Sequence, residues 1–166
     1  MLATASGIIS DARVLVERAQ IKAQQHRVEY DSPVDTLSIV KDICSLKQIC
    51  TQSGGLRPFG VSLLVGGIDL DKPRLFETDP TGIYFEYMAV AIGELETEVS
   101  DILQKQYKDD ITVEEGLKLL VKTMIAVLDK NFDVNRLDCA YIKSNEKKFM
   151  KLKRDQVEKI VKAVKK

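Results

Sequence analysis

The sequence is poor in the residues from which metal sites and most catalytic centres are built. It has one histidine, His26, and three cysteines, Cys44, Cys50 and Cys139. No Cys-x-x-Cys pair and no glycine-rich phosphate loop occur, so neither a metal nor a cofactor is expected. Cys44 and Cys50 lie six residues apart on a predicted helix, about 9 Å along its axis, which is too far for a disulfide. We therefore predict reduced thiols in an intracellular chain.

Long apolar runs are also missing. No stretch approaches the roughly 18–20 apolar residues that a membrane-spanning helix needs, and the first residues carry no positive charge. We expect neither a secretory signal nor a membrane partner. A chain of 166 residues that is 45% apolar and 30% charged is typical of a folded domain. We predict one domain over residues 1–166, in which 154–166 form a terminal helix and basic tail.

The net charge is zero, but its distribution is uneven. Residues 143–166 contain ten Lys or Arg and three Asp or Glu, a net charge of +7 that the remaining residues balance. A basic end of this kind can indicate nucleic-acid binding. It lacks the series of interleaved aromatic side chains on which bases would stack. We expect a solvated helix face and no nucleic-acid partner.

Hydrophobic periodicity predicts two helices at the start of the chain. Ser10 and Asp11 can cap a helix that runs to about residue 30. Ser32 and Pro33 form a typical helix opening, and the helix that follows should end at the Ser-Gly-Gly of residues 53–55. The short link between the two helices predicts an antiparallel pair.

The middle of the sequence is rich in β-branched and aromatic residues, which predicts three strands, at residues 59–67, 74–78 and 83–92. The last two strands are joined by Asp79-Pro80-Thr81-Gly82. Pro80 presets the second position of a turn, and Gly82 can adopt a positive φ. This short link predicts a β-hairpin.

Helices return in the last part of the chain. One is expected over about residues 95–108, and a second opens at Thr112, which forms a capping box with Glu115. A further hairpin is expected from residues 137–143 and 147–152. A second capping box, formed by Asp155 and Glu158, predicts a last helix. Helix pairs that alternate with hairpins predict the α+β class, with helices on antiparallel sheets.

Few residues suggest catalysis. His26 lies on the apolar side of the first predicted helix and could act as a base, although a packed histidine with a satisfied ring is more frequent. Asp69, Asp71 and Glu77 flank the strands and could form an acid–base pair. Such neighbours are common in a chain with 25 acidic residues. Composition and spacing alone therefore indicate an α+β domain without a defined chemistry.

Five stretches, in order and at matching spacing, resemble the α-type subunits of the proteasome core particle. They are Ser-Gly-Ile-Ile-Ser-Asp-Ala-Arg at 6–13, Ala-Gln-Gln-His-Arg at 23–27, Thr-Gln-Ser-Gly-Gly-Leu-Arg-Pro-Phe-Gly at 51–60, Thr-Asp-Pro-Thr-Gly at 78–82 and Ala-Val-Ala-Ile-Gly at 89–93. The resemblance implies an Ntn-hydrolase-like α-β-β-α sandwich. The chain matches its C-terminal two-thirds, so we expect the N-terminal strands of the family to be missing.

The resemblance also implies a function. Family members of this type are non-catalytic subunits of the heptameric outer α ring, which supports ring assembly, pore gating and docking of regulatory caps in ubiquitin-dependent degradation. The implied partners are other α subunits, β subunits and regulatory caps, and the implied location is the cytoplasm and nucleus. No enzyme activity of the chain itself is expected.

Site residues follow from the same resemblance. The strand-to-helix turn of Ser6, Gly7 and Ile8 is expected to line a pocket for the C-terminal tails of caps. The family lysine that pairs with the tail carboxylate lies upstream of this turn, so we expect the chain alone to bind tails weakly. Structural roles are implied for two further motifs, Arg57, Pro58, Phe59 and Gly60, and Asp79, Pro80 and Gly82.

Two alternative functions are a catalytic enzyme and an adaptor. A catalytic β-type threonine peptidase needs an N-terminal Thr whose own amine acts as base. Thr4 is internal, because Met1 precedes it. The third possibility is an adaptor that reuses the fold for another purpose.

Overall fold

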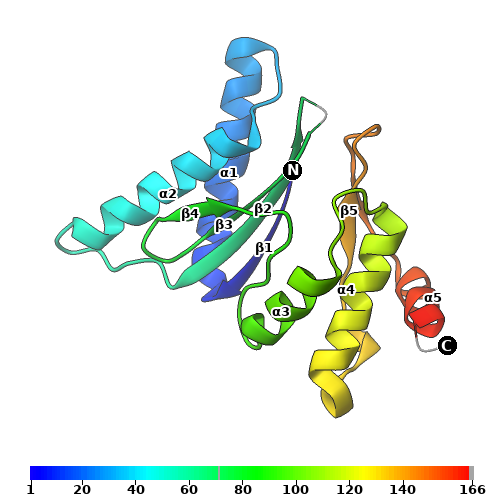
Figure 1. Cartoon of the computed structure of the whole chain (residues 1–166). Coiled ribbons are helices and arrows are strands. Elements are labelled where there is room, and N and C mark those ends of the chain that lie inside the picture. Colours follow the sequence, from blue (N-terminus) through cyan, green and yellow to red (C-terminus); the bar gives the residue numbers. More distant parts are fainter. Residues whose placement is uncertain (71, 165–166) are drawn as a thin grey trace. The chain divides into compact units, whose positions relative to one another are not determined.

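The computed structural model describes residues 1–70 and 72–164 and shows an α+β fold (Figure 1). Its described strands form two antiparallel sheets, so the predicted fold class is confirmed. Lys165 and Lys166 of the predicted basic tail lie outside the described residues. The chain divides into two compact units, Met1–Met88 and Ala89–Lys166. No helix in the described part of the chain has the length and apolar character needed to cross a bilayer.

The first unit is built on a four-stranded sheet. Its strands are β1 (Leu2–Gly7), β2 (Val61–Asp69), β3 (Lys72–Thr78) and β4 (Tyr84–Glu86), and they lie side by side in that order. Each neighbouring pair is antiparallel. The register places Gly7 opposite Val61 and Leu63 opposite Thr78. The ends of β1 and β3 therefore both lie near the beginning of β2.

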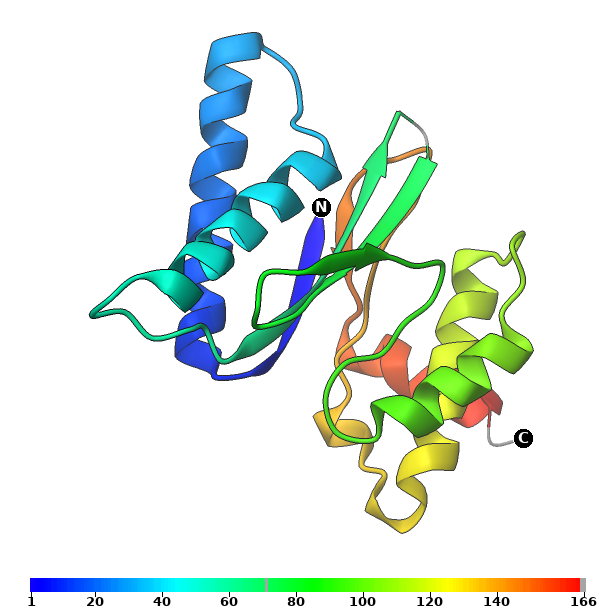
Figure 2. The ribbon, with the colours of Figure 1, turned by 60° about the vertical axis from the view of Figure 1, so that its left-hand side comes forward.

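Two helices cover one face of this sheet, α1 (Ile9–Tyr30) and α2 (Thr36–Gln52) (Figures 1 and 2). Successive side chains of a strand point to opposite faces, so alternate residues of β2 meet the helices. The core between helices and sheet is apolar and includes Leu15, Ile39, Val40, Ile43, Val61, Leu63, Val65 and Phe76. Burial of each large apolar side chain contributes about 1.5–3 kcal/mol to folding.

The helix starts in this unit differ from those predicted. Helix α1 begins at Ile9, and Ser10 and Asp11 lie inside it rather than at a cap. Helix α2 begins at Thr36, where the Asp35 side chain accepts a hydrogen bond from the Ser38 N–H at 2.8 Å. The predicted opening at Ser32 and Pro33 is wrong because the chain first crosses to the core, where Val34 is buried. The predicted end of α2 is confirmed at Ser53.

The predicted third strand is too long. Strand β4 ends at Glu86, and its ladder continues only through the Tyr87 N–H, which donates to Leu75 O at 2.9 Å. Composition alone predicts a strand for the apolar residues 88–92. They lie where the first unit ends and the second begins, at Met88 and Ala89. Strand preference depends on a partner strand, and no strand in the described part of the chain pairs with these residues.

The second unit combines helices with a small hairpin. It contains α3 (Glu96–Gln106), α4 (Val113–Leu128), two short 3₁₀ turns (Asp129–Asn131 and Val134–Arg136), β5 (Ala140–Ile142), β6 (Phe149–Lys151) and α5 (Arg154–Val164). The hairpin predicted at residues 137–152 is confirmed with shorter strands. Its core joins Val121 of α4 to Val157 and Val161 of α5.

The two capping boxes predicted in this unit have different outcomes. The Thr112 hydroxyl accepts from the Glu115 N–H, and Glu115 accepts from the Thr112 N–H at 3.0 Å, so the first box is confirmed. The second is wrong, because α5 begins at Arg154 and Asp155 lies within its first turn. Glu158 instead forms an ion pair with Arg154 at 3.7 Å.

Candidate functional site

The chain passes from β1 to α1 through a turn made by Ser6, Gly7 and Ile8. Gly7 has a φ of 118°, a region that residues with a side chain rarely adopt. A Cβ atom at this position would also overlap the carbonyl oxygen of Gly60. The turn therefore needs glycine for its backbone torsion and for the close approach of a second segment.

That second segment is residues 57–60, about fifty positions away in the sequence. The Ile8 N–H donates to Gly60 O at 2.8 Å. A Cβ atom added to Gly60 would lie 2.6 Å from the Cδ1 atom of Ile8, so the Ile8 side chain lies directly over this glycine. Ile8 remains 45% exposed. The structure thus unites the 6–8 turn with the Arg-Pro-Phe-Gly motif in one site.

Asp11 joins the two segments. Its carboxylate accepts hydrogen bonds from Nη1 and Nη2 of Arg57, both at 2.7 Å, and from the Gly60 N–H at 2.9 Å. A bidentate Arg–carboxylate pair fixes orientation as well as distance. The Arg57 hydrogen bonds, followed by that of Gly60, lower the pKa of Asp11 to about 2. Asp11 is therefore ionised at neutral pH and serves as the brace of the site.

Sequence reasoning missed this role for Asp11 because it was interpreted as a possible helix cap. A signal was present, since the Asp-Ala-Arg and Arg-Pro-Phe-Gly stretches both belong to the resemblance. Pairing them requires knowledge that β1 lies beside β2, which local sequence patterns do not provide. Phe59 was expected inside a buried strand, but β2 begins at Val61. Phe59 is half-buried and packs against the edge of the core.

The turn predicted at residues 79–82 is present. Oδ1 of Asp79 accepts from the N–H groups of Thr81 and Ile83 at 2.9 and 3.0 Å. Gly82 has a φ of 93°, and a Cβ there would lie 2.6 Å from the carbonyl oxygen of Cys44. Burial tends to raise the pKa of Asp79, but the hydrogen bonds outweigh it and the pKa is lowered. The turn therefore packs tightly on α2.

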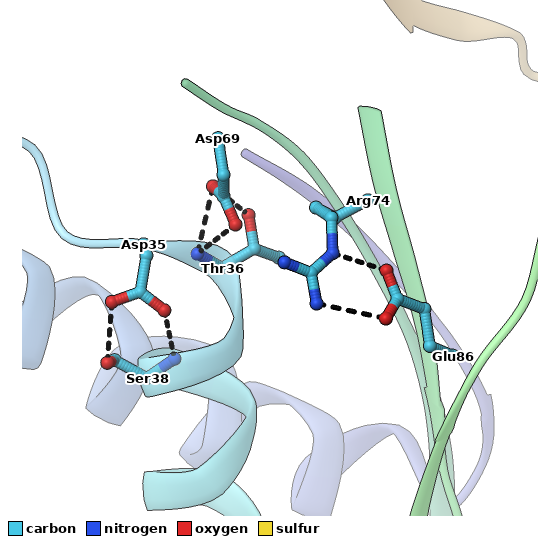
Figure 3. A network of polar contacts seen from close by, with 6 residues as sticks. All are labelled: Asp35, Thr36, Ser38, Asp69, Arg74 and Glu86. Carbon is cyan, nitrogen blue, oxygen red and sulfur yellow. Dashed lines mark hydrogen bonds and ion pairs between the residues drawn. The ribbon is translucent and has the colours of Figure 1, made fainter. Parts of the chain in front are cut away.

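A second polar network surrounds the start of α2 (Figure 3). Both oxygens of Asp69 accept from the Thr36 N–H at 3.0 Å, and Oδ1 also accepts from the Thr36 hydroxyl at 2.7 Å. Asp35 caps the same helix through Ser38. A carboxylate at a helix N-terminus is stabilised by the unpaired N–H groups there. Asp69 is therefore a capping group, which removes it as a candidate acid or base.

Arg74 and Glu86 form the other part of this network (Figure 3). Nη2 of Arg74 donates to Glu86 at 2.9 Å, Nε donates to the second carboxylate oxygen, and the guanidinium lies 5.0 Å from the ring centre of Phe76. These contacts link β3 to β4. Of the other predicted carboxylates, Glu77 lies on β3, and Asp71 is outside the described residues.

The remaining catalytic candidates do not converge on one place. The Nδ1 atom of His26 lies 3.1 Å from Ser32 O, and its ring packs on Tyr30. Thr4 lies inside β1, opposite Leu64. Within residues 1–70 and 72–164, no group of three His, Cys, Asp or Glu side chains is placed to hold a metal ion. The site consists of a hydrogen-bonded turn with one exposed apolar side chain, Ile8.

Comparison with known proteins identifies one family. The family model described as proteasome subunit matches residues 1–142. The chain is 46% identical over 162 residues to the proteasome subunit alpha of Pyrococcus horikoshii. It is 42% identical to that of Methanocaldococcus jannaschii and 41% identical to that of Methanopyrus kandleri, each over 162 residues.

These alignments cover nearly all of this chain but only part of each relative. The 162 aligned residues are 98% of the chain and 62% of the relative in the first two cases, and 98% and 65% in the third. The chain thus spans about three-fifths of the length of the curated relatives that it matches.

Proposed function

Because this chain belongs to the proteasome subunit family, we propose that it is a structural, non-catalytic subunit of the outer α ring of a proteasome core particle. The names of its relatives, proteasome subunit alpha, support the α type. The observation that carries the proposal is the brace at Asp11. This carboxylate is occupied by Arg57 and Gly60, so the site is built to hold a shape.

The shape suits the docking of a peptide tail. The turn is exposed at Gly7, and Ile8 adds an apolar side chain that is 45% exposed. A ligand can therefore approach the backbone closely while an apolar residue packs against Ile8. We propose that the turn receives the C-terminal tails of regulatory caps, which in this family end in a hydrophobic residue, tyrosine and any residue.

The partners and the wider role are part of the same proposal. The chain would pack with other α subunits in a heptameric ring, dock on a β ring and support closure of the pore. The relatives named above are archaeal, and their names concern only the subunit type. Ubiquitin dependence and a cytoplasmic and nuclear location remain predictions.

Native mass spectrometry tests the structural role. Complexes are purified through a tag on this chain and treated with a covalent threonine-directed probe. We expect α and β proteasome subunits to co-purify, with the probe attached only to other chains. Probe attached to this chain, or purification without any proteasome subunit, would contradict the proposal.

Peptide titration tests the docking role. A peptide ending in a hydrophobic residue, tyrosine and one further residue is titrated into assembled particles that contain the parent chain or Ile8→Asp. Loss of an apolar contact should weaken binding by about tenfold or more. Ile83→Asp is a matched control, because Ile83 is similarly exposed at 52% but lies in the 79–82 turn region. Equal affinity in all three particles would rule out docking at Ile8.

A further inference from the structure

Lys47 on α2 is completely buried, with 0% of its surface exposed. Lysine is almost never fully buried unless its charge is compensated. Lys47 lies on the same helix face as Ile43, Cys44 and Cys50, which are also buried. An ammonium group in such surroundings is costly unless each of its hydrogens finds an acceptor.

The structure provides one acceptor for each hydrogen. Nζ of Lys47 donates to Val61 O at 2.9 Å, to Oγ1 of Thr78 at 2.8 Å and to Asp79 O at 3.0 Å. A lysine ammonium has three donors, so its hydrogen-bonding capacity is filled. The acceptors belong to the first residue of β2, the last residue of β3 and the turn after β3. The Lys47 side chain therefore connects α2 to β2, to β3 and to the turn after β3.

These segments lead directly to the 6–8 turn. Val61 is opposite Gly7 in the β1–β2 ladder, and it follows Gly60, whose carbonyl accepts the Ile8 N–H. On the other side, Asp79 opens the turn whose Gly82 packs against the carbonyl of Cys44, one helical turn before Lys47. A change in the Lys47 contacts would therefore displace the backbone on which Gly7 and Ile8 rest.

We propose that Lys47 is the positioning residue of the 6–8 turn, whose buried ammonium fixes Val61 and Asp79 relative to α2. The position of Gly60, and with it that of Gly7 and Ile8, follows from this contact. The consequence for tail docking rests on the proposed function. The positioning itself concerns only the folded chain.

The protonation state of Lys47 is part of this mechanism. The titratable groups that act on it are Cys44 on its own helix and Asp79 on the turn, while β2 and β3 present a carbonyl and a hydroxyl. Burial lowers the pKa of Lys47 to about 8 and raises the pKa of Cys44 to about 11. The Thr78 hydroxyl can accept from an ammonium or donate to a neutral amine. Deprotonation of Lys47 therefore changes the direction of its hydrogen bond with Thr78 but does not remove that bond.

A titration followed by NMR tests the coupling in the full chain. The ¹³Cε shift of Lys47 and the carbonyl ¹³C shifts of Val61 and Asp79 are recorded between pH 6 and pH 11. We expect the three signals to move together with a midpoint of about 8. Titration of Lys47 while both carbonyl signals stay constant would overturn the proposal. This experiment needs no variant, so it remains decisive if substitutions impair folding.

Substitution provides the second test. Amide hydrogen exchange is measured at the N–H groups of Ile8 and Gly82 near pH 7. In Lys47→Met, exchange at both should increase by about 10- to 100-fold, because three charge-assisted hydrogen bonds are lost. Lys41→Met is the matched control, since Lys41 is an exposed lysine of the same helix, and it should change neither.

The comparison among amides separates positioning from general stability. We expect the increase at Ile8 and Gly82 to exceed that at amides in the middle of α1. Unchanged exchange at Ile8, or an equal increase throughout the first unit, would count against a positioning role. These exchange measurements involve no tail peptide, so they test the positioning role alone. Weak tail binding by a chain with the expected exchange at Ile8 would contradict only the proposed docking function.

Discussion

The polar contacts inside the first unit differ in kind from those inside the second. In Met1–Met88, the buried side chains of Asp11, Lys47 and Thr36 bind partners far away in the sequence. Asp11 binds Arg57, Lys47 binds Thr78, and Asp69 binds Thr36, across 46, 31 and 33 positions. In Ala89–Lys166, most side-chain hydrogen bonds among the described residues are local and exposed, as between Thr112 and Glu115 or between Asp133 and Asn135.

The difference explains why the candidate site lies in the first unit. Buried polar groups must all be satisfied, so a network of distant partners permits one arrangement of the backbone. Local bonds stabilise single helices and turns but do not fix one segment against another. A docking turn needs its position fixed relative to the rest of the fold.

The largest effect is expected from the apolar core of the first unit. Phe76→Ala should lower the free energy of unfolding by about 3–5 kcal/mol, because Phe76 is almost fully buried among both helices and β2. Phe85→Ala is the control, since Phe85 is 59% exposed on the neighbouring strand. Urea denaturation followed by circular dichroism measures both. Similar losses in the two variants would show that the core has been assigned to the wrong face.

Gly7→Ala should have the next largest effect. A residue with a side chain at a φ of 118° costs about 1–3 kcal/mol, and its Cβ would also displace Gly60. Gly54→Ala should be nearly neutral, because nothing lies within 4 Å of a Cβ there. The thermal unfolding midpoints of the two variants provide the measurement. If Gly7→Ala is as stable as Gly54→Ala, the close contact between Gly7 and Gly60 is contradicted.

In the second unit the comparison predicts a smaller and local effect. Thr112→Ala removes the cap of α4 and should cost about 1 kcal/mol. Hydrogen exchange should increase in the first turn of α4 and leave the Ile8 amide unchanged. An increase that extends to Ile8 would contradict the distinction between local and distant contacts.

The smallest effect is expected from a change of pH, and it concerns the ion pair between Asp11 and Arg57. The pKa of Asp11 is about 2 when folded and 3.8 ordinarily, so its contribution to stability is complete above about pH 4. As pH falls from about 4 to about 2, the unfolded chain takes up the proton first and this contribution is lost. The acid dependence of unfolding should therefore be weaker in Asp11→Asn than in the parent. Identical pH profiles would exclude the ion pair as a source of stability.

Local patterns in the sequence were sufficient for much of the fold. The capping box of Thr112 and the turn at Gly82 were predicted because each depends on residues within a few positions. Errors arose where a distant contact overrides the local preference. Val34 is buried in the core, so α2 starts later than predicted. Residues 88–92 pair with none of the strands that the structure describes.

The candidate site was predictable only in part. The resemblance pointed to Gly7 and to Gly60, but not to the contact between them. Lys47 lies at a core position of the α2 pattern, and this was the available signal. A lysine there is interpreted as an interruption of the apolar stripe unless its acceptors are known. Those acceptors are backbone and hydroxyl oxygens from other strands, which no local pattern reveals.

The most direct test of the account is a double-mutant cycle on the pair that joins the two segments of the site. Asp11→Asn, Arg57→Gln and the double variant are compared with the parent by hydrogen exchange at the Ile8 and Gly60 amides. Residues in one hydrogen-bonded network show effects that do not add. The account predicts that each single variant increases exchange at both amides and that the double variant adds little further. Additive effects, or exchange that is unchanged in the single variants, would contradict the claim that this pair holds the turn in place.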